Sequence, residues 1–446
     1  MKINIQPEAD IIIKTLREHG FEAYAVGGCV RNAMMGLDAH DWDICTNARP
    51  DELRAVFRDF NTYDYGLKHG TLVVTAGGGS FEVTSYRVDG VYADNRRPES
   101  VTFTDDLSLD LSRRDFTVNA MAYNDEDGLK DPFGGAEDLK NGLLRCVGVP
   151  ENRFNEDALR ILRGLRFASV YGFAVEKETA DAVHRNARLL RNIAAERVRE
   201  ELLRTICGKN AANVLDEFRD VIAVVIPELS ETFDFPQNTP HHKYDVWRHI
   251  LHSVEAVEPS PELRMTMLLH DIGKPRARTT DENGCDHFKY HQKISAEMAE
   301  TILRRLRCPS EFIKTVLTLT EWHDLRFTGG EKQVRRVLRD LGEENTRMLF
   351  AVQRADIAAQ SDHLRTEKLA ALDLAERSYN EILAQNRCFS LAQLAVNGND
   401  LLAVGVKKGK NVGALLHLLL EEVIDGDLPN EKHALLERAK SEIKKI

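Results

Sequence analysis

The chain has 446 residues, of which 43% are hydrophobic and 29% charged, which is the composition of an ordinary soluble protein. Its length predicts several folded units, because a single core rarely grows beyond roughly 250–300 residues. Its net charge of −11 argues against a generic polyanion binder, because contacts with phosphates need local positive charge. No apolar run approaches the roughly 20 residues of a membrane span, the N-terminus lacks an apolar export signal, and the seven cysteines form no CxxC pair, so we expect a cytoplasmic protein with free thiols and no membrane association.

The first 150 residues predict an α+β unit. Residues 5–20 have the spacing of an amphipathic helix that ends at Gly20. Shorter helices are expected at residues 31–35 and 50–57, and β-rich stretches at residues 23–26, 41–46, 70–76, 80–86 and 120–124. This mixture indicates a small antiparallel or mixed sheet with helices on one side. The polar stretch 87–101, which contains a glycine and a proline, is expected to be a mobile loop.

Helical periodicity dominates the rest of the chain, and no further strand is expected after Gly135. It runs from Asn155 to Gly208 and then through short helices to about residue 230. The expected domains are a head at 1–150, a helical neck at 151–235, a histidine-rich unit at 240–365, and a helical tail at 366–446 with a lysine-rich loop suited to RNA. Between Arg153 and Arg204 there are eleven basic and eight acidic residues, and ten of the basic residues are arginines, which pair bidentately with phosphates and base edges. The neck is therefore predicted to contact nucleotide and RNA, with a surface of salt bridges as the alternative.

The most informative run reads GGCVRNAMMGLDAHDWD and begins at Gly27. Gly27 and Gly28 allow backbone N–H groups to approach phosphate oxygens closely, and Arg31 adds a cation. Asp41 and Asp43 are two residues apart, so on a strand both side chains would leave the same face. Two such carboxylates can hold Mg²⁺ together with substrate phosphates, which is the arrangement that nucleotidyl transfer uses. An isolated Asp-x-Asp is usually a solvated turn, but the glycines and Arg31 upstream favour catalysis.

Two further motifs follow in order, RRDFTVNA from Arg113 and RFNEDALR from Arg153. Together the three motifs resemble the signature of class II nucleotidyltransferases, the family of CCA-adding enzymes and bacterial poly(A) polymerases. A weaker resemblance continues to the C-terminus. The resemblance implies a polymerase-β-like head with a mixed sheet and helices, followed by all-α domains.

The resemblance also implies roles for the residues of the first motif. Gly27 and Gly28 would bind the incoming triphosphate, Arg31 would pair with it, and Asp41 and Asp43 would hold the Mg²⁺ ions. Polymerases of this kind often use a third carboxylate on a neighbouring strand. Glu82, an acid between apolar residues, fits this role best by its pattern, and an exposed strand acid is the alternative.

The second motif is expected to contact the sugar and phosphates. Arg114 would pair with phosphates, while Asp115 and Asn119 could read the ribose, whose 2′-hydroxyl is both donor and acceptor. The alternative is an Arg–Asp pair that braces the strand. Between the first two motifs, Asp94 and residues 96–98 resemble the flexible loop of enzymes that add the complete CCA.

The third motif points to the substrate. Asp157, Arg160 and Arg163 are spaced by three, which on one helix places them on one face, whereas Arg166 is about half a turn away and is expected to face phosphate or solvent. A carboxylate accepts a hydrogen bond from the amino group of cytosine or adenine, and a guanidinium donates one to the ring nitrogen. Guanine and uracil have the reverse polarity at these positions, so a hydrogen-bonded site would reject them. Acceptance of C and A alone is what untemplated CCA addition requires.

The histidine-rich unit resembles the HD phosphohydrolase superfamily. The resemblance is carried by His249, the pair His270-Asp271, and Asp356, while His291 and His323 could add a second metal ion. Imidazole and carboxylate ligands suit several divalent metals, and the sequence does not choose among them. If the unit is active, it should cleave phosphomonoesters or 2′,3′-cyclic phosphates, and a degenerate unit that serves as an RNA scaffold is the alternative.

These observations predict an enzyme that adds CCA to the 3′ end of tRNA from CTP and ATP, with release of pyrophosphate. Within the family, an A-adding enzyme or a poly(A) polymerase is the nearest alternative. From other classes, the alternatives are an HD phosphohydrolase with an inactive head and a non-catalytic RNA-binding protein.

Overall fold

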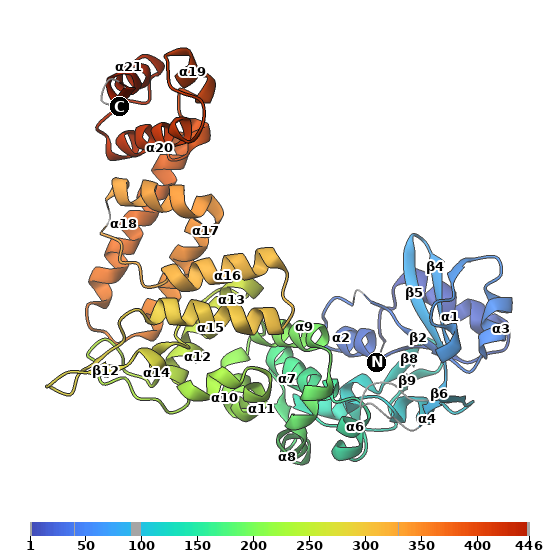
Figure 1. Ribbon diagram of the computed structural model, residues 1–446. Helices are drawn as coiled ribbons and strands as arrows, with labels where there is room; N and C mark the ends of the chain where they lie inside the picture. Colours follow the sequence, from blue (N-terminus) through green and yellow to red (C-terminus); the bar gives the residue numbers. More distant parts are fainter. Residues whose placement is uncertain (1, 40, 91–99, 329, 444–446) are drawn as a thin grey trace. The chain divides into compact units, whose positions relative to one another are not determined.

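The computed structural model describes residues 2–39, 41–90, 100–328 and 330–443. The chain divides into two compact units, residues 1–227 and residues 228–446. The long β-strands lie in the N-terminal unit, whereas the C-terminal unit is almost entirely helical (Figure 1). No helix among the described residues combines the length and the apolar character that crossing a membrane requires. The finer division into four domains stays a prediction.

The N-terminal unit is built on a mixed sheet, which confirms the predicted α+β head. Its seven described strands lie in the order β3-β4-β5-β2-β1-β8-β9. Strands β2 and β5 are parallel, with Ile44 opposite Val83, and the other neighbours are antiparallel. The strands are β1 (Ala23–Val26), β2 (Ile44–Thr46), β3 (Asn61–Tyr63), β4 (Thr71–Ala76), β5 (Gly79–Ser85), β8 (Ala122–Asn124) and β9 (Gly128–Lys130).

Apolar side chains cover both faces of this sheet, because successive strand residues point to opposite sides. On one face, Ile12 and Leu16 of the first helix pack with Ala25 of β1 and other strand residues. On the other face, Tyr24 of β1 packs in a smaller cluster with Leu111. The short helices of this part are α1 (Pro7–Glu18), α2 (Gly28–Met34), α3 (Pro50–Val56), η1 (Leu67–His69), α4 (Leu107–Ser112), η2 (Thr117–Asn119) and α5 (Gly135–Lys140).

The rest of the N-terminal unit is helical, and its two longer helices α7 and α9 pack against each other. The helices are α6 (Pro150–Glu156), α7 (Leu159–Tyr171), α8 (Lys177–Asn186), η3 (Ala187–Asn192), α9 (Ala195–Ile206), α10 (Ala211–Glu217) and α11 (Arg219–Val225). The segment from Asn155 to Gly208 is mostly helical, as expected, but it is divided into several helices, because the chain is extended at Asp157 and left-handed at Gly172.

In the C-terminal unit, helices α12, α13, α16 and α18 pack against the long helix α17. Helix α17 changes direction at Gly342, whose φ of 76° lies in the left-handed region that glycine adopts readily. The elements are η4 (Pro227–Thr232), α12 (Val246–Ala256), α13 (Pro261–Leu269), α14 (Lys274–Ala277), β12 (Thr279–Thr280), β13 (Asp286–His287), α15 (His291–Arg305), α16 (Ser310–Trp322), α17 (Glu331–Ala359), α18 (Arg365–Ala384), η5 (Leu391–Gln393), α19 (Gly398–Ala403), α20 (Lys410–Asp425) and α21 (Lys432–Ile443).

Several sequence predictions of strands need correction. Strands β3 and β9 were not predicted, and two short strands, β6 (Arg87–Asp89) and β7 (Val101–Phe103), pair where only a loop was expected. The strand expected from residue 41 begins at Ile44, because aspartate is a poor strand former. Two-residue strands also occur after Gly135, namely β10 (Leu143–Leu144), β11 (Ala174–Val175), β12 and β13, and they are too short to leave a periodic signal. The loop residues Asp94 and 96–98 lie outside the described residues.

Candidate functional site

A cavity of about 520 Å³ in the N-terminal unit brings together the residues that the three motifs contribute. Its lining includes twelve of the thirteen residues expected in the head site: Gly27, Gly28, Arg31, Asp41, Asp43, Arg114, Asp115, Asn119, Asp157, Arg160, Arg163 and Arg166. Glu82 does not line the cavity. The three motifs, which are far apart in the sequence, thus lie side by side in the structure.

Three carboxylates lie at one end of this cavity or beside it. Asp41 and Asp43 precede β2, and Glu82 stands opposite Asp43 because the parallel register pairs the next residues, Ile44 and Val83. Burial, and then the charges of Glu82 and Asp41, raise the pKa of Asp43 to about 6, against the opposing effect of Arg114. The carboxylates are therefore close enough to repel one another. An all-oxygen set of this kind fits a hard divalent cation such as Mg²⁺.

Gly27 occupies a position that no other residue fits easily. Its φ is 83°, and a Cβ atom there would lie 2.9 Å from Nη1 of Arg114. The backbone N–H of Gly27 donates a hydrogen bond to the carbonyl oxygen of Met121 at 3.1 Å, next to the second motif. The glycine therefore lets the first motif approach Arg114 of the second.

Arg31 is a buried cation, with 5% of its surface exposed. Its guanidinium donates hydrogen bonds to Asn119 and, at 2.8 Å, to the hydroxyl of Tyr171, and it lies over the rings of Tyr171 and Phe167 at 4.6 and 4.9 Å. Burial lowers the pKa of Arg31. Among the described residues no carboxylate forms an ion pair with it, so an anionic ligand would supply the missing countercharge.

Asp115 is held by the protein rather than left free for a ligand. Its Oδ2 accepts hydrogen bonds from Nε and Nη2 of Arg163 at 2.8 and 2.6 Å, and its Oδ1 accepts one from the Asn119 amide at 3.0 Å. Burial opposes its ionisation, but Arg163, Asn119 and Arg160 outweigh burial and hold the pKa of Asp115 well below its usual range. Asp115 of the second motif therefore pairs with Arg163 of the third motif, and not with its neighbour Arg114.

Asp157 does not share a helix with Arg160, contrary to the prediction from their spacing. It lies in the extended break between α6 and α7, where its Oδ1 accepts a hydrogen bond from the backbone N–H of Leu159 at 3.1 Å. Aspartate favours such positions because its short side chain can satisfy a free N–H at the start of a helix. Its Oδ2 accepts a hydrogen bond from Nη2 of Arg197 at 3.1 Å. Asp157 and Arg160 still line the same cavity.

The neighbouring arginines are also paired within the protein. Arg160 donates to Glu156 at 2.6 Å and to the carbonyl oxygen of Arg113 at 2.8 Å. Arg166, expected to face phosphate or solvent, lines the cavity and forms an ion pair with Glu201 at 2.6 Å.

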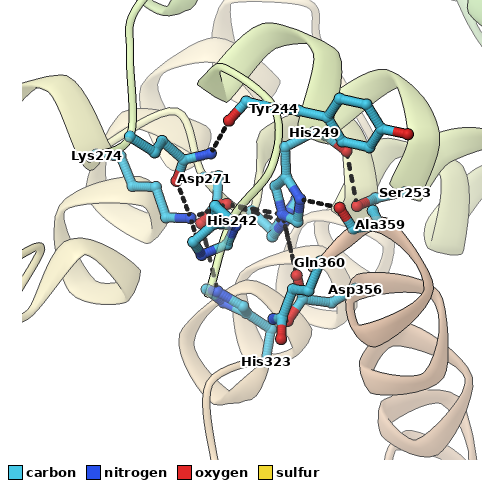
Figure 2. Close-up of polar contacts among 12 residues, drawn as sticks. His242, Tyr244, His249, Ser253, Asp271, Lys274, His323, Asp356, Ala359 and Gln360 are labelled. Atoms are coloured by element: carbon cyan, nitrogen blue, oxygen red, sulfur yellow. Dashed lines mark hydrogen bonds and ion pairs between the residues drawn. The ribbon is translucent and has the colours of Figure 1, made fainter. Parts of the chain in front are cut away.

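The C-terminal unit contains a second cavity, of about 550 Å³, beside a cluster of histidines and aspartates. His249, His270 and Asp271 form one group of possible metal ligands, and Asp271, His291 and His323 form another, so Asp271 belongs to both. Oδ1 of Asp356 lies 3.0 Å from Nε2 of His249. All six residues of the predicted metal set therefore lie together, and Figure 2 shows His249, Asp271, His323 and Asp356 converging.

The hydrogen bonds of the four histidines fix which ring nitrogen faces the cluster. Each Nδ1 lies within 3.3 Å of a backbone carbonyl oxygen, so it carries the proton and Nε2 is left with its lone pair. The Nε2 atoms of His249 and His270 are 3.2 Å apart, and those of His291 and His323 are 3.1 Å apart. Facing lone pairs at this distance repel unless a cation lies between them, and a neutral imidazole oriented by a carbonyl is the usual metal ligand.

The charges around this cluster also favour a cation. Burial opposes the protonation of His270, but Asp271 and then Asp356 outweigh it and raise its pKa to about 10, so without a metal ion a proton would take the place of the cation at its Nε2. Lys274 is buried, with its Nζ 2.6 Å from Oδ2 of Asp271. Burial, and then the charge of Lys274, lower the pKa of His242 to about 2, so this histidine is neutral and its Nε2 accepts a hydrogen bond from Lys274 at 3.3 Å (Figure 2).

Known proteins resemble the chain along almost its whole length. The CCA-adding enzyme of Ligilactobacillus salivarius is 32% identical over 440 residues, which cover 96% of this chain and 95% of that protein. That of Levilactobacillus brevis is 33% identical over 428 residues, covering 95% of each chain. The chain belongs to the CCA-adding enzyme family. It is therefore a nucleotidyltransferase that acts on tRNA, as predicted, and neither the A-adding and poly(A) alternatives nor an inactive head is favoured.

Structural and domain comparisons agree with this membership in the CCA-adding enzyme family. The crystal structure of the Bacillus stearothermophilus CCA-adding enzyme in complex with CTP superposes with a TM-score of 0.72 at 30% identity, covering 99% of this chain and 100% of that one. Family models match residues 23–145 as the poly(A) polymerase head domain, 172–232 as the RNA- and SrmB-binding site of polymerase A, and 278–439 as tRNA nucleotidyltransferase domain 2. Nucleotidyltransferases of this family use a divalent metal ion.

The sequence did not predict seven of the residues that line the cavity of the N-terminal unit: Cys29, Asn32, Ala39, Arg113, Leu159, Phe167 and Arg197. Among these seven, Arg113 and Arg197 bring positive charge and Phe167 brings an aromatic ring to the cavity. Arg113 adjoins Arg114 in the second motif, which was the available signal. Contacts made across forty residues, such as that of Arg197 with Asp157, leave no local pattern in a single sequence.

Proposed function

We propose that the cavity of the N-terminal unit adds C, C and A in turn to the 3′ end of tRNA, using CTP and ATP with Mg²⁺. The observation that carries this proposal is the convergence of the three motifs on one cavity in a chain that matches CCA-adding enzymes from end to end. In the reaction, the tRNA 3′-hydroxyl attacks the α-phosphate of the nucleotide and pyrophosphate leaves.

The metal-binding role falls to Asp41 and Asp43, with Glu82 beside them. A divalent cation bound there would lower the pKa of the attacking hydroxyl and stabilise the charge that develops on the phosphate. The raised pKa of Asp43 supports this assignment, because a carboxylate that is costly to ionise alone gains most from a cation. Glu82 lies outside the cavity lining, so its role is to tune the charge of Asp43 or to reach the metal from the neighbouring strand.

The triphosphate and the base are assigned to different residues of the cavity. Arg31 supplies a buried charge without a carboxylate partner among the described residues, and Arg114 lies against the Gly27 turn, which suits both to phosphates. Asp157 and Arg160 are assigned to the base, where the carboxylate accepts from the amino group of C or A and the guanidinium donates to the ring nitrogen. Asp115 and Arg163 hold each other, and through Asn119 they orient Arg31.

The test is incubation of the purified protein with Mg²⁺ and a tRNA that lacks its terminal CCA. Two additions with CTP alone, a third with ATP, and then arrest are expected. Addition of A only to a tRNA that already ends in CC, or a long A tail, would replace the proposal with one of the family alternatives. Absence of incorporation and of pyrophosphate release would overturn it.

A second function is supported by the cluster around Asp271 in the C-terminal unit, which we propose is a divalent-metal phosphohydrolase of the HD type. The paired lone pairs of His249 with His270 and of His291 with His323 support metal binding there. The bound metal would polarise a phosphate ester and supply a water molecule of lowered pKa. Lys274, buried beside Asp271, orients that carboxylate and adds positive charge at the base of the cavity.

Hydrolysis of p-nitrophenyl phosphate with Mn²⁺, Ni²⁺ or Mg²⁺ tests this second function. The Asp41→Asn variant should retain the activity and Asp271→Asn should lose it, because the two sites use different residues. Hydrolysis that survives Asp271→Asn would exclude the cluster as its source.

A further inference from the structure

Two basic residues line the cavity beside the metal cluster. Arg326 follows α16, Lys368 lies on α18, and both line the cavity of about 550 Å³. Among the described residues, no ion pair joins either of them to a carboxylate, although most arginines in this chain are so paired. Two further lysines line the cavity: Lys274 pairs with Asp271 at 2.6 Å, and Lys289 is exposed and also has no ion pair among the described residues.

Lys368 is tied to the metal cluster through a single side chain. Its Nζ donates a hydrogen bond to Oε1 of Gln360 at 2.5 Å, and Nε2 of the same Gln360 donates to Oδ2 of Asp356 at 2.7 Å. Figure 2 shows Gln360 beside Asp356 at the cluster. A group bound to Lys368 would therefore lie one side chain away from a group bound at the metal ligands.

Arg326 and Lys368 are close enough to act on the same neighbours. Burial lowers the pKa of Lys368, and Arg326 adds to this effect while Asp356 and Asp324 oppose it. Burial also lowers the pKa of His241, and both Lys368 and Arg326 contribute. His241 and His242 line the cavity too, and Nδ1 of each is buried without a hydrogen-bond partner among the described residues. This part of the cavity, lined by Arg326, Lys368, His241 and His242, therefore offers cations and unused hydrogen-bonding groups together.

We propose that Arg326 and Lys368 form an anion subsite, so that the cavity takes nucleotides with two phosphate groups, one at the metal cluster and one on this pair. The inference rests on the proposed phosphohydrolase and names its substrate class. The combined charge of Arg326 and Lys368 matches that of one further phosphate. The cavity is also much larger than one phosphate needs and falls within the range of roughly 300–1,000 Å³ that small-molecule sites occupy. Phe288 and Phe327 in its lining offer apolar surface to the nucleoside between the phosphates.

The test compares adenosine 3′,5′-bisphosphate with 3′-AMP and 5′-AMP, which differ from it by one phosphate each. Binding to the full-length protein loaded with Mn²⁺ is measured by isothermal titration calorimetry, so that the result does not depend on turnover. The bisphosphate should bind about tenfold or more tightly than either monophosphate, since a charge-assisted contact contributes at least that factor.

Variants locate the second phosphate. Arg326→Met and Lys368→Met should each reduce the preference for the bisphosphate about tenfold and leave 3′-AMP binding unchanged. Lys243→Met removes an exposed lysine of the same unit that does not line the cavity, and it should keep the full preference. A preference that persists in both cavity variants would belong to another site and would overturn the subsite.

Hydrolysis separates this inference from the function on which it rests. If both classes of nucleotide bind as expected but neither is cleaved, the subsite stands and the phosphohydrolase fails. If both are cleaved with equal KM in the parent protein and the variants, the phosphohydrolase stands and the subsite is wrong.

Discussion

Arg197 of α9 donates a hydrogen bond from Nη2 to Oδ2 of Asp157 at 3.1 Å. Asp157 lies in the break between α6 and α7, and its other carboxylate oxygen is fixed by the N–H of Leu159. Because both oxygens have protein partners, the carboxylate assigned to base selection has a set orientation before nucleotide binds. A helix forty residues further along the chain thus takes part in positioning that residue.

Loss of this contact should impair selection of the base. Arg197→Met leaves Asp157 free to rotate, so kcat/KM for CTP and ATP should fall about tenfold and discrimination against UTP should weaken. Single-nucleotide incorporation into tRNA measures both. Arg191→Met removes an exposed arginine of the same unit outside the cavity and should have no effect. Unchanged selectivity in Arg197→Met would show that the contact is only structural.

Removal of one metal-binding carboxylate should abolish nucleotide transfer. In Asp41→Asn the rate of pyrophosphate release should fall by on the order of a thousandfold, because the cation loses a charged ligand. Asp38→Asn changes an exposed aspartate of the same loop outside the cavity and is the matched control. Residual incorporation near the parental rate would refute the role assigned to Asp41.

The apparent affinity for Mg²⁺ should depend on pH through Asp43. Its pKa is raised to about 6, so below pH 6 a proton competes with the metal, and affinity should fall as the pH drops. Glu82→Gln removes one charge that raises this pKa and should shift the decline to lower pH. Mg²⁺ titrations of activity between pH 5 and 8 on both proteins check the direction. A decline at the same pH in the variant would contradict the assigned coupling.

Gly27 and Gly36 provide a matched pair of substitutions. Both have positive φ, 83° and 69°, so alanine should cost about 1 kcal/mol of unfolding free energy at either position. Only at Gly27 does the new Cβ meet a site residue, Arg114 at 2.9 Å, while at Gly36 nothing lies within 4 Å. Gly27→Ala should therefore also raise KM for CTP, and Gly36→Ala should not. Thermal unfolding and steady-state kinetics separate the two effects.

Metal binding at the Asp271 cluster should stabilise the folded chain. A metal present at a hundred times its Kd contributes about 2.7 kcal/mol to the free energy of unfolding. Calorimetry should show a higher Tm with Mn²⁺ than with a chelator. Asp271→Asn should lose most of this difference, and Asp362→Asn, at an exposed aspartate, should retain it. Equal shifts in both variants would place the stabilising ion elsewhere.

The sequence predicted the elements whose signals are local. Strand β1 has the predicted bounds, Ala23–Val26, because four consecutive apolar residues between polar neighbours are buried on both faces of the sheet. Strands β6 and β7 were missed because each has only three residues, too few for their alternation to be distinguished from a loop. The break at Asp157 was missed because the apolar spacing continues through it, although the backbone does not.

The candidate sites were predictable as sets of residues but not as contacts. Motif order was enough to gather His249, Asp271 and Asp356, since metal ligands need particular side chains. The pairing of Asp115 with Arg163 and the position of Glu82 opposite Asp43 depend on tertiary packing and strand register, which one sequence does not specify.

Gly342 divides α17 into two helical segments, referred to as the first and the second rod, which hold different parts of the C-terminal unit. On the first rod, Arg335 donates hydrogen bonds to the carbonyl oxygens of Cys388 and Ile424, so it carries the C-terminal helices. The second rod carries Asp356. A small rotation of the backbone at Gly342 would therefore move the C-terminal helices, while Asp356 kept its position among the other proposed metal ligands.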